Sequence, residues 1–409
     1  MDQNLIYKNN SLFLDGLSFK EIYEEFGSPC YIYSEKTILN NLRRYQDSLK
    51  DRGLICFSVK ANSNTNILKL ISDQGAGFDV VSGGELAKVL YVGAQPDKII
   101  FSGVGKSNEE LVMAMQNEIK SINIESISEL NRINLLSKNG KFKPNISLRI
   151  NPEVSLDTHP YLETGSKENK FGISLDEVEE CVKIIKNSST LNLVGLAFHI
   201  GSGIESFEQL VPALDVTKEV YKDLSKFFDL KIIDIGGGLS HKKSLGEDLI
   251  ELVISQVLKQ APNNAEIVVE PGKSIIAEAG FLLTRVQYIK KRNKNIVVVD
   301  AAMNDMMRVA LYGAKHEIKN ISNNEKTSNA SIIVGPICES SDVFDEDSFI
   351  KVNEGDILAI FDVGAYGFSM SSNYNSRLKP SEVLVSDGQA KLIRNRESIE
   401  MLINNENIS

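Results

Sequence analysis

The sequence is poor in cysteine, and its few cysteines are far apart. Cys30, Cys56, Cys181 and Cys338 are the only four in 409 residues, and no two of them form a Cys-x-x-Cys pair. Cysteines spaced in this way support neither a structural zinc site nor a disulfide framework. We therefore expect a protein of a reducing compartment that holds no metal.

The sequence also lacks an excess of positive charge and any long apolar run. Its 45 Lys and Arg residues are outnumbered by 55 Asp and Glu residues, for a net charge of −10. Such a chain is a poor candidate for binding nucleic acid or an anionic membrane. No apolar run approaches the ~20 residues of a membrane span, and the opening MDQNLIYKNN does not have the pattern of a signal peptide. We expect a cytoplasmic protein whose partners are a small molecule or another protein chain.

Short apolar or β-branched runs recur along the first 270 residues. They predict eight buried strands at 54–59, 77–81, 98–102, 121–125, 145–150, 193–198, 231–235 and 266–270. Amphipathic segments such as TNILKLISDQG and LDEVEECVKIIKN lie between them and predict helices. Eight alternations of strand and helix predict a parallel sheet that closes as a (β/α)8 barrel over residues 33–280, with an open doubly wound sheet as the alternative.

The pattern changes after about residue 280, where strand-like runs follow one another with little helix between them. Examples are FLLTRVQYIKK, NIVVVDA, ASIIVG and DILAIFDV. They predict a mainly antiparallel β domain over residues 281–409. Residues 1–32 precede the barrel and contain LIYK and LFL, so we expect them to add a strand to that domain.

Chemically versatile residues gather at the predicted strand ends. In a (β/α)8 barrel the active site lies at the carboxyl ends of the strands. Those ends carry a lysine, a histidine, an arginine and several carboxylates: Lys60, Asp79, Ser102, Glu125, Arg149, His199, Gly236 and Glu270. Their convergence on one end of the barrel predicts the active site there.

Two glycine-containing loops follow the seventh and eighth strands, where barrels of this kind often bind phosphate. They read DIGGGLS, with Gly236, Gly237 and Gly238, and VEPGKS, with Pro271, Gly272 and Lys273. Glycine lets backbone N–H groups approach a phosphate closely. The alternative is that the glycines only make a tight turn.

Three side chains near these loops fit pyridoxal phosphate chemistry. Lys60 ends an apolar strand, where partial desolvation makes its amine available for a Schiff base, although a lysine there can also extend into solvent. Glu270 could face a pyridine nitrogen, and His199 could lie against the ring, unless it is simply a core histidine. A reactive lysine beside a phosphate cradle is what this cofactor requires.

With these residues in place, the chain resembles the fold-type III pyridoxal-phosphate decarboxylases over essentially its whole length. Among them it is most similar to the enzymes that convert meso-2,6-diaminopimelate to L-lysine and CO2. The resemblance is carried by several blocks in one order, among them FSVKANSN, FDVVSGGEL, THPYLETGSKENKFGI, HIGSG, DIGGG, EPGKS, GPICESSDVF and GAYGFSMSSNYNSRLKP.

The resemblance implies a role for each matched residue. Lys60 would carry the cofactor, His199 would stack on its ring, Glu270 would pair with the ring nitrogen, and Asp79 would support them. Phosphate would be held by Ser202, Gly237, Gly238 and the Pro271–Lys273 backbone. Cys338 would protonate the carbanion, and the substrate would be contacted by Lys273, Arg308, Tyr312, Glu339 and Tyr366, with Tyr366 also near the cofactor.

The resemblance further implies a homodimer in which the Cys-Glu-Ser segment of one chain completes the active site of the other. The sequence departs from the family pattern at Lys273, where arginine is usual, and lysine keeps the charge but loses the bidentate fork. The same chemistry on another amino acid or a specialised secondary-pathway substrate is therefore the alternative function. A racemase or a non-catalytic homologue fits less well, because Lys60 and the Cys338 block are both present.

Overall fold

The computed structural model describes residues 5–8, 10–154, 169–240, 248–404 and 406–407. Residues 158–168 of the block THPYLETGSKENKFGI, one of those on which the resemblance depends, lie outside this part. The chain divides into two compact units, one of residues 41–274 and one that combines residues 1–40 with 275–409. In the described part of the chain, no helix has the length and apolar character needed to span a bilayer.

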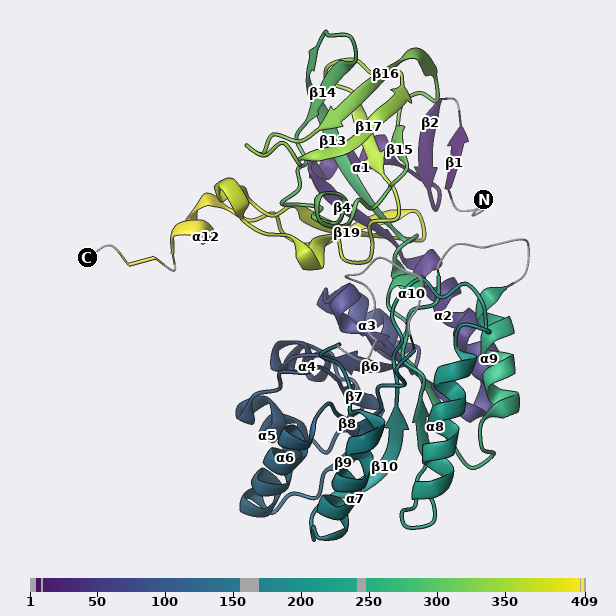
Figure 1. Cartoon of the computed structure of the whole chain (residues 1–409). Coiled ribbons are helices and arrows are strands. Elements are labelled where there is room, and N and C mark those ends of the chain that lie inside the picture. Colours follow the sequence, from purple (N-terminus) through teal and green to yellow (C-terminus); the bar gives the residue numbers. More distant parts are fainter. Residues whose placement is uncertain (1–4, 9, 155–168, 241–247, 405, 408–409) are drawn as a thin grey trace. The chain divides into compact units, whose positions relative to one another are not determined.

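The first unit is a closed barrel of eight parallel strands (Figure 1). The closing contact pairs β12 with β5, with Val268 opposite Leu54, so the barrel is confirmed over the open sheet. Apolar runs bounded by helices form these strands because both faces of each strand are covered. The strands are β5 (Gly53–Ser58), β6 (Gly77–Val80), β7 (Ile99–Phe101), β8 (Ser121–Ile124), β9 (Asn145–Arg149), β10 (Asn192–Ala197), β11 (Ile232–Asp234) and β12 (Glu266–Val269).

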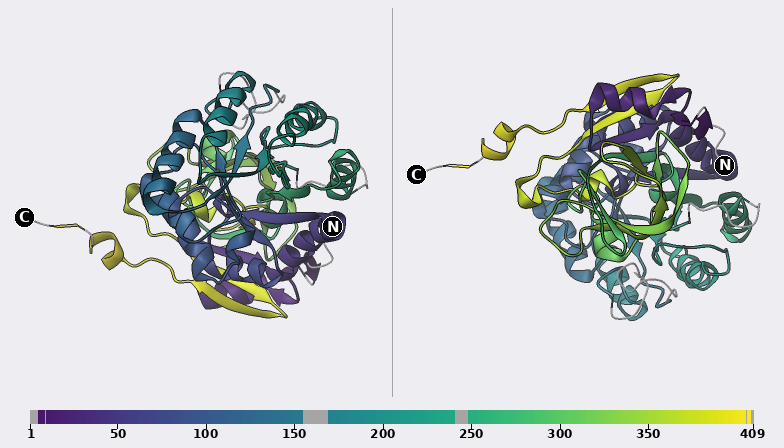
Figure 2. Two further views of the ribbon diagram at one scale, coloured as in Figure 1. Left: turned by 90° about the horizontal axis from the view of Figure 1, so that it is seen from below. Right: turned by 90° about the horizontal axis from the view of Figure 1, so that it is seen from above.

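Helices follow the strands and form a ring around them (Figure 2). Several begin at a serine whose hydroxyl accepts a backbone N–H of the first turn; Ser107 does so within a capping box with Glu110. The helices of this unit, with α2 and α10 shared at its two boundaries, are α2 (Glu35–Leu49), α3 (Thr65–Asp73), α4 (Gly83–Tyr91), α5 (Asn108–Gln116), α6 (Ile127–Gly140), α7 (Val178–Lys186), α8 (Val211–Leu224), α9 (Leu249–Gln260) and α10 (Lys273–Ile276).

The second unit is built on a nine-stranded sheet in which β4 (Cys30–Ser34) lies between β13 and β19. Most neighbours are antiparallel, as the sequence predicts, but β4 with β19 and β14 with β16 are parallel. The other strands are β13 (Gly280–Lys290), β14 (Asn295–Val299), β15 (Ile318–Asn320), β16 (Lys326–Val334), β17 (Val343–Ile350), β18 (Ile357–Ile360), β19 (Ser381–Ser386) and β20 (Gln389–Arg394), with short helices α11 (Arg308–Tyr312) and α12 (Ile399–Ile403).

The N-terminal residues join this unit, as expected, and they contribute strands to two different sheets. LIYK and LFL form β1 (Leu5–Lys8) and β2 (Ser11–Leu14), which pair with β3 (Leu17–Ser18) in a separate three-stranded sheet. The N-terminal strand that enters the large sheet is β4, which comes after α1 (Phe19–Phe26) in the chain. The small sheet still contributes to the same core, because Leu12 and Leu14 pack in one buried cluster with Ile32, Leu283 and Val383.

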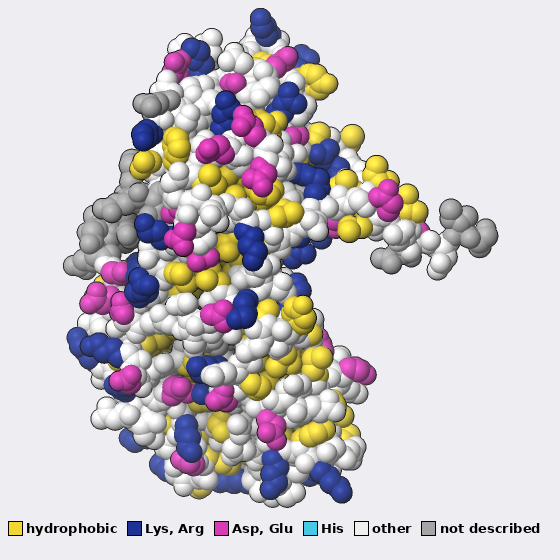
Figure 3. Space-filling model, turned by 180° about the vertical axis from the view of Figure 1, so that it is seen from behind, with side chains coloured by type: hydrophobic (Ala, Val, Ile, Leu, Met, Phe, Trp, Pro, Cys, Tyr) yellow, Lys and Arg dark blue, Asp and Glu magenta, His cyan; other side chains and the backbone are white. Residues whose placement is uncertain are grey.

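Charged side chains of both signs are interspersed on the face drawn in Figure 3. That distribution agrees with a modest acidic excess spread over the chain. On α12, by contrast, three large apolar side chains are exposed: Ile399, Met401 and Ile403.

Candidate active site

The carboxyl ends of neighbouring barrel strands bring Lys60 and Asp79 together. Lys60 lies in a short 3-10 turn directly after β5, and Asp79 lies within β6, in register with Ser58. The Lys60 Nζ is 3.5 Å from the Asp79 Oδ2, and the Ser58 hydroxyl donates to the same oxygen at 2.9 Å. Asp79 is fully buried, whereas the Lys60 side chain is 40% exposed.

Three carboxyl groups are buried together at this end of the barrel. Asp79 and Asp234 are almost completely buried, and Glu270 is 8% exposed. Burial, followed by the charges of Asp234 and Asp79, raises the pKa of Glu270 well above its usual value. Burial also raises the pKa of Asp234 to about 6. Asp234 and Glu270 therefore keep their protons to a higher pH than exposed carboxyls do.

Polar side chains from two further strands complete this cluster. Asn123 of β8 donates from Nδ2 to the Ser102 Oγ at 3.1 Å and to the Asp234 Oδ2 at 3.2 Å. Ser102 in turn donates to the Glu270 Oε1 at 3.4 Å. Asn123 and Asp234 are absent from the set predicted from the sequence. Each lies between two isoleucines of a predicted strand, in SINIE and KIIDI, and that was the signal available to find them.

His199 follows β10, and its ring is fixed by the glycine loop after β11. The Gly237 N–H donates to the His199 Nδ1 at 3.2 Å. Burial, then the charges of Lys60 and Arg149, lowers the pKa of His199 well below its usual value. The imidazole is therefore neutral, and because Nδ1 accepts a hydrogen bond, its proton is on Nε2.

The glycine loop packs tightly against the ends of the adjacent strands. A Cβ on Gly237 would lie 2.2 Å from the Glu270 carbonyl oxygen, and one on Gly238, whose φ is +99°, would lie 2.0 Å from the Gly201 carbonyl oxygen. Gly203 N–H donates to the Gly238 carbonyl at 2.9 Å, which places Ser202 beside this loop. These contacts require glycine at both positions whether or not an anion binds, so phosphate binding here stays a prediction.

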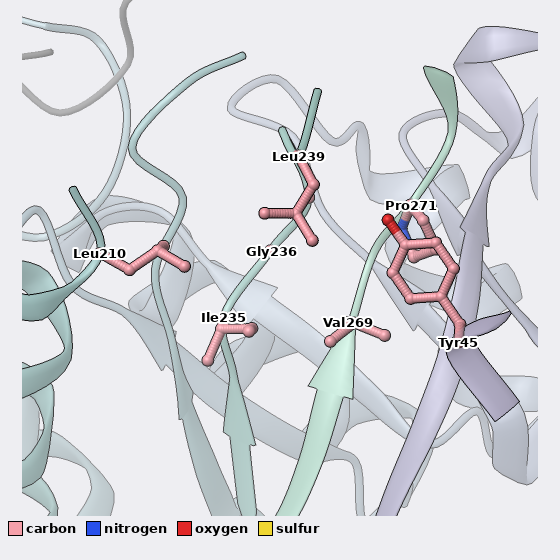
Figure 4. Close-up of a pocket in the computed structure, with 8 residues that line it drawn as sticks. Tyr45, Leu210, Ile235, Gly236, Leu239, Val269 and Pro271 are labelled. Atoms are coloured by element: carbon pink, nitrogen blue, oxygen red, sulfur yellow. The ribbon is translucent and has the colours of Figure 1, made fainter. Parts of the chain in front are cut away.

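The second loop, Pro271 to Ser274, is anchored from below by α2. The Tyr45 hydroxyl and the Ser274 Oγ are 2.7 Å apart in a buried hydrogen bond. Tyr45 and Pro271 also line a small apolar pocket with Gly236, Gly237 and four aliphatic side chains, Leu210, Ile235, Leu239 and Val269 (Figure 4). Residues of both loops therefore line the same apolar pocket. Lys273, half-buried, lies within the second loop and begins α10.

Glu125 and Arg149, the remaining charged strand-end residues, pair with each other. The Arg149 Nη1 is 2.6 Å from the Glu125 Oε1, and Gly103 N–H donates to the same oxygen at 3.1 Å. The Arg149 guanidinium lies 4.9 Å from the centre of the Phe171 ring. The positive charge of Arg149 is one of the causes that lower the pKa of His199.

The other predicted site residues belong to the second unit. Arg308, which begins α11, is 8% exposed, and its guanidinium lies 5.7 Å from the centre of the Tyr366 ring. Tyr366 has a φ of +59°, an unusual conformation for a tyrosine. Tyr312 ends α11, half-buried. Cys338 and Glu339 lie in the exposed loop between β16 and β17, and Glu339 accepts a hydrogen bond from the Tyr374 hydroxyl.

The barrel residues fit pyridoxal phosphate. Asp79 Oδ1 is buried without a hydrogen-bond partner in the described part of the chain, and two further carboxyls lie nearby. A cationic ring nitrogen at Glu270 would add a positive charge beside these buried carboxyls. Lys60 presents a primary amine at the same end of the barrel, and His199 presents a neutral ring.

Comparison with known proteins agrees with this chemistry. The model of the pyridoxal-binding domain of pyridoxal-dependent decarboxylases matches residues 35–277. The chain is 40% identical to the diaminopimelate decarboxylase of Aquifex aeolicus over 406 residues, which cover 98% of this chain and 96% of that protein. It is likewise 40% identical to the Haemophilus influenzae enzyme of the same name over 410 residues, covering 97% of each.

Solved structures give the same result. Diaminopimelate decarboxylase from M. jannaschii superposes with a TM-score of 0.93 at 36% identity, covering all of this chain and 98% of that one. The Helicobacter pylori enzyme, solved in complex with L-lysine, gives 0.89 at 40% identity, covering 94% and 98%. A viral arginine decarboxylase, at 23% identity and a TM-score of 0.79, shares the fold. The chain therefore belongs to the pyridoxal-dependent decarboxylase family, in the group of the diaminopimelate decarboxylases.

Proposed function

We propose that the chain removes CO2 from the D-configured centre of meso-2,6-diaminopimelate and releases L-lysine. The observation that carries this proposal is the arrangement at the barrel end, where the Lys60 amine, the neutral His199 ring and the buried Glu270 carboxyl lie together. The relatives that match the chain over nearly its whole length carry the name of this activity, and one was solved with the product lysine.

The residues of the barrel would bind the cofactor and control its charge. When bound, pyridoxal phosphate supplies an electron sink for the electron pair that the departing CO2 leaves behind. Lys60 would hold the aldehyde carbon through its amine, and Glu270 would keep the ring nitrogen protonated. His199 would cover one ring face without adding charge, because its pKa is far below neutrality. Ser202, Gly237, Gly238 and the Pro271–Lys273 backbone would hold the phosphate.

Lys273 and several residues of the second unit would bind the substrate. Arg308 and Lys273 supply cations for the distal carboxylate of diaminopimelate, and Glu339 supplies an anion for its ammonium group. Tyr312 and Tyr366 would line the same site. The Cys338 thiol, exposed in the single chain, would donate its proton to the carbon that has lost CO2, and a proton from water would restore the thiol.

We further propose a cytoplasmic homodimer. Cys338 and Glu339 stand on an exposed loop, so their side chains are available to a second copy of the chain. In that arrangement each chain would complete the barrel site of the other.

Lys273 favours one alternative, the same reaction on a different amino acid. Lysine offers a point charge where arginine would offer two parallel hydrogen bonds to a carboxylate. A substrate without the distal carboxylate would not need that fork. Retention of Arg308 and Glu339 argues for diaminopimelate.

The test is product formation by the purified protein with added pyridoxal phosphate. Meso-diaminopimelate, ornithine, arginine and lysine would be compared at equal concentration, with Lys60→Ala as the inactive control. We expect lysine release from diaminopimelate alone, and neither turnover nor covalently held cofactor in the variant. A yellow protein that ignores diaminopimelate but decarboxylates another of the four would establish the alternative instead.

A further inference from the structure

Hydrogen bonds fix the base of the loop that carries Cys338 and Glu339. These bonds do not reach the tip of the loop. Asp342 accepts from the Met303 N–H at 2.7 Å through Oδ1 and from the Ile337 N–H at 2.8 Å through Oδ2. The Gly335 N–H donates to the Asp342 carbonyl at 3.0 Å. These bonds close the loop between β16 and β17. They leave Cys338 and Glu339 exposed.

Two consecutive residues of another segment hold the tip. The Tyr374 hydroxyl donates to the Glu339 Oε1, and the Cys338 N–H donates to the Asn375 Oδ1 at 3.2 Å. Bonding to the Glu339 carboxylate raises the pKa of Tyr374, so the phenol keeps its proton and remains a donor. Both bonds connect residues more than 30 positions apart, 35 in one case and 37 in the other.

The segment that makes these bonds is itself held in an unfavourable backbone conformation. Asn375, at φ 55° and ψ 26°, and Ser376, at φ 55°, are both left-handed. Asparagine tolerates this region and serine does so less readily. The conformation is imposed from its flanks: Ser372 N–H donates to the Asn304 carbonyl at 2.9 Å, and Asn373 Nδ2 donates to Glu397 Oε2 at 2.6 Å. Strain that the surroundings impose in this way is characteristic of functional sites.

We propose that Tyr374 and Asn375 are positioning residues for the decarboxylation, Tyr374 orienting the Glu339 carboxylate toward the substrate ammonium group and Asn375 orienting Cys338 for proton transfer. This inference rests on the proposed function. The two neighbouring residues have different roles: Tyr374 affects substrate binding, and Asn375 affects the step that consumes the Cys338 proton. Neither residue touches the reacting atoms in this scheme.

The two roles predict different kinetic signatures. In Tyr374→Phe the carboxylate loses its donor, and we expect KM for diaminopimelate to rise about 5- to 20-fold with kcat changed less than about 3-fold. Asn375→Gly keeps the left-handed backbone and removes the acceptor, so kcat should fall about 10-fold with little change in KM. Asn375→Asp, which retains an acceptor oxygen, should restore most of kcat. Tyr288→Phe, the same change at an exposed tyrosine on β13, is the matched control.

A second readout does not depend on turnover. Cys338 is the exposed cysteine, while Cys30, Cys56 and Cys181 are buried, so alkylation of the native protein by iodoacetamide reports on Cys338. We expect the alkylation rate to rise several-fold in Asn375→Gly and to return in Asn375→Asp. Inactivity of the wild type on diaminopimelate would refute the proposed function, and the alkylation rates would still test the contact.

Three results would overturn the inference. Unchanged KM in Tyr374→Phe would remove the role of Tyr374, and unchanged kcat and alkylation in Asn375→Gly would remove that of Asn375. Equal impairment of Asn375→Asp and Asn375→Gly would assign the loss to the fold. Cofactor absorbance and melting temperature, measured for every variant, should match those of the wild type.

Discussion

The carboxyl end of the barrel and the loop between β16 and β17 carry chemically similar groups in opposite surroundings. Asp79, Asp234 and Glu270 are buried, and they accept hydrogen bonds from the side chains of Ser58, Asn123 and Ser102, respectively. The pKa is raised for Asp234 and for Glu270. Glu339 and Cys338 are exposed, and their bonds are to Tyr374 and Asn375 in a second segment. The free-energy cost of ionising a carboxyl is therefore higher at the barrel end than in the exposed loop.

This difference teaches where stability and activity are coupled. Burying carboxyls destabilises the folded chain at any pH at which they must ionise, and a bound cation relieves the penalty. We therefore expect cofactor binding at the barrel end to stabilise the folded chain. The exposed loop incurs no such penalty, so its residues can be exchanged at little cost to the fold.

Replacement of Cys338 by alanine gives the largest effect that we expect in the exposed loop. Loss of a positioned proton donor lowers rates by about 10²- to 10⁴-fold, whereas an exposed side chain contributes within about 0.5 kcal/mol to stability. Turnover of diaminopimelate and the melting temperature, measured together on the variant, should show the first change without the second. Full turnover in Cys338→Ala would assign the proton to another group, and a large drop in melting temperature would contradict the contrast between the regions.

The strands of the barrel could be predicted from the sequence because each is an apolar run long enough to be buried on both faces. All eight runs became strands, and β12 pairs with β5 to close the barrel. β4 was missed, although CYIYS is buried at all five positions. A lone run of five residues gives no indication of its partners, and β4 pairs with β13 and β19, about 250 and 350 residues away.

The candidate site divides in the same way. Lys60, His199 and Glu270 could be found from their position at strand ends, since barrel topology alone brings those ends together. Asp234 and Asn123 could not be assigned a role, because their bond to each other joins residues 111 positions apart and needs the closed barrel. Tyr374 and Asn375 lie in irregular backbone, where no periodicity predicts which side chain meets which.

Glu270→Gln tests the buried side of the comparison through the pH dependence of stability. The pKa of Glu270 is raised in the folded state, so its folded form binds a proton that the unfolded chain releases. The stability that these protonated carboxyls contribute is complete below the unfolded pKa of about 4. It is lost as pH rises through the raised folded pKa values of Glu270 and of Asp234, which is about 6 for Asp234. Denaturant unfolding of the cofactor-free variant should therefore show a gain at pH 8 over wild type that shrinks at pH 5.

Glu339→Gln is the control for that experiment, because it makes the same chemical change at an exposed carboxyl. It should leave the difference in unfolding free energy between pH 5 and pH 8 as it is in the wild type. Equal pH dependence in Glu270→Gln and wild type would mean that the buried cluster does not hold extra protons.

Lys273→Arg is the subtlest test, because the half-buried residue 273 joins the two regions in function while keeping its charge. If Lys273 binds the distal carboxylate of diaminopimelate, arginine would add a second hydrogen bond and lower KM about 2- to 10-fold. Lys291→Arg, at an exposed position just after β13, should leave KM unchanged. A rise in KM for Lys273→Arg would instead indicate that the site is shaped around a lysine, and so for a ligand other than diaminopimelate. Steady-state kinetics at saturating pyridoxal phosphate therefore separates a tolerated substitution from a change of substrate.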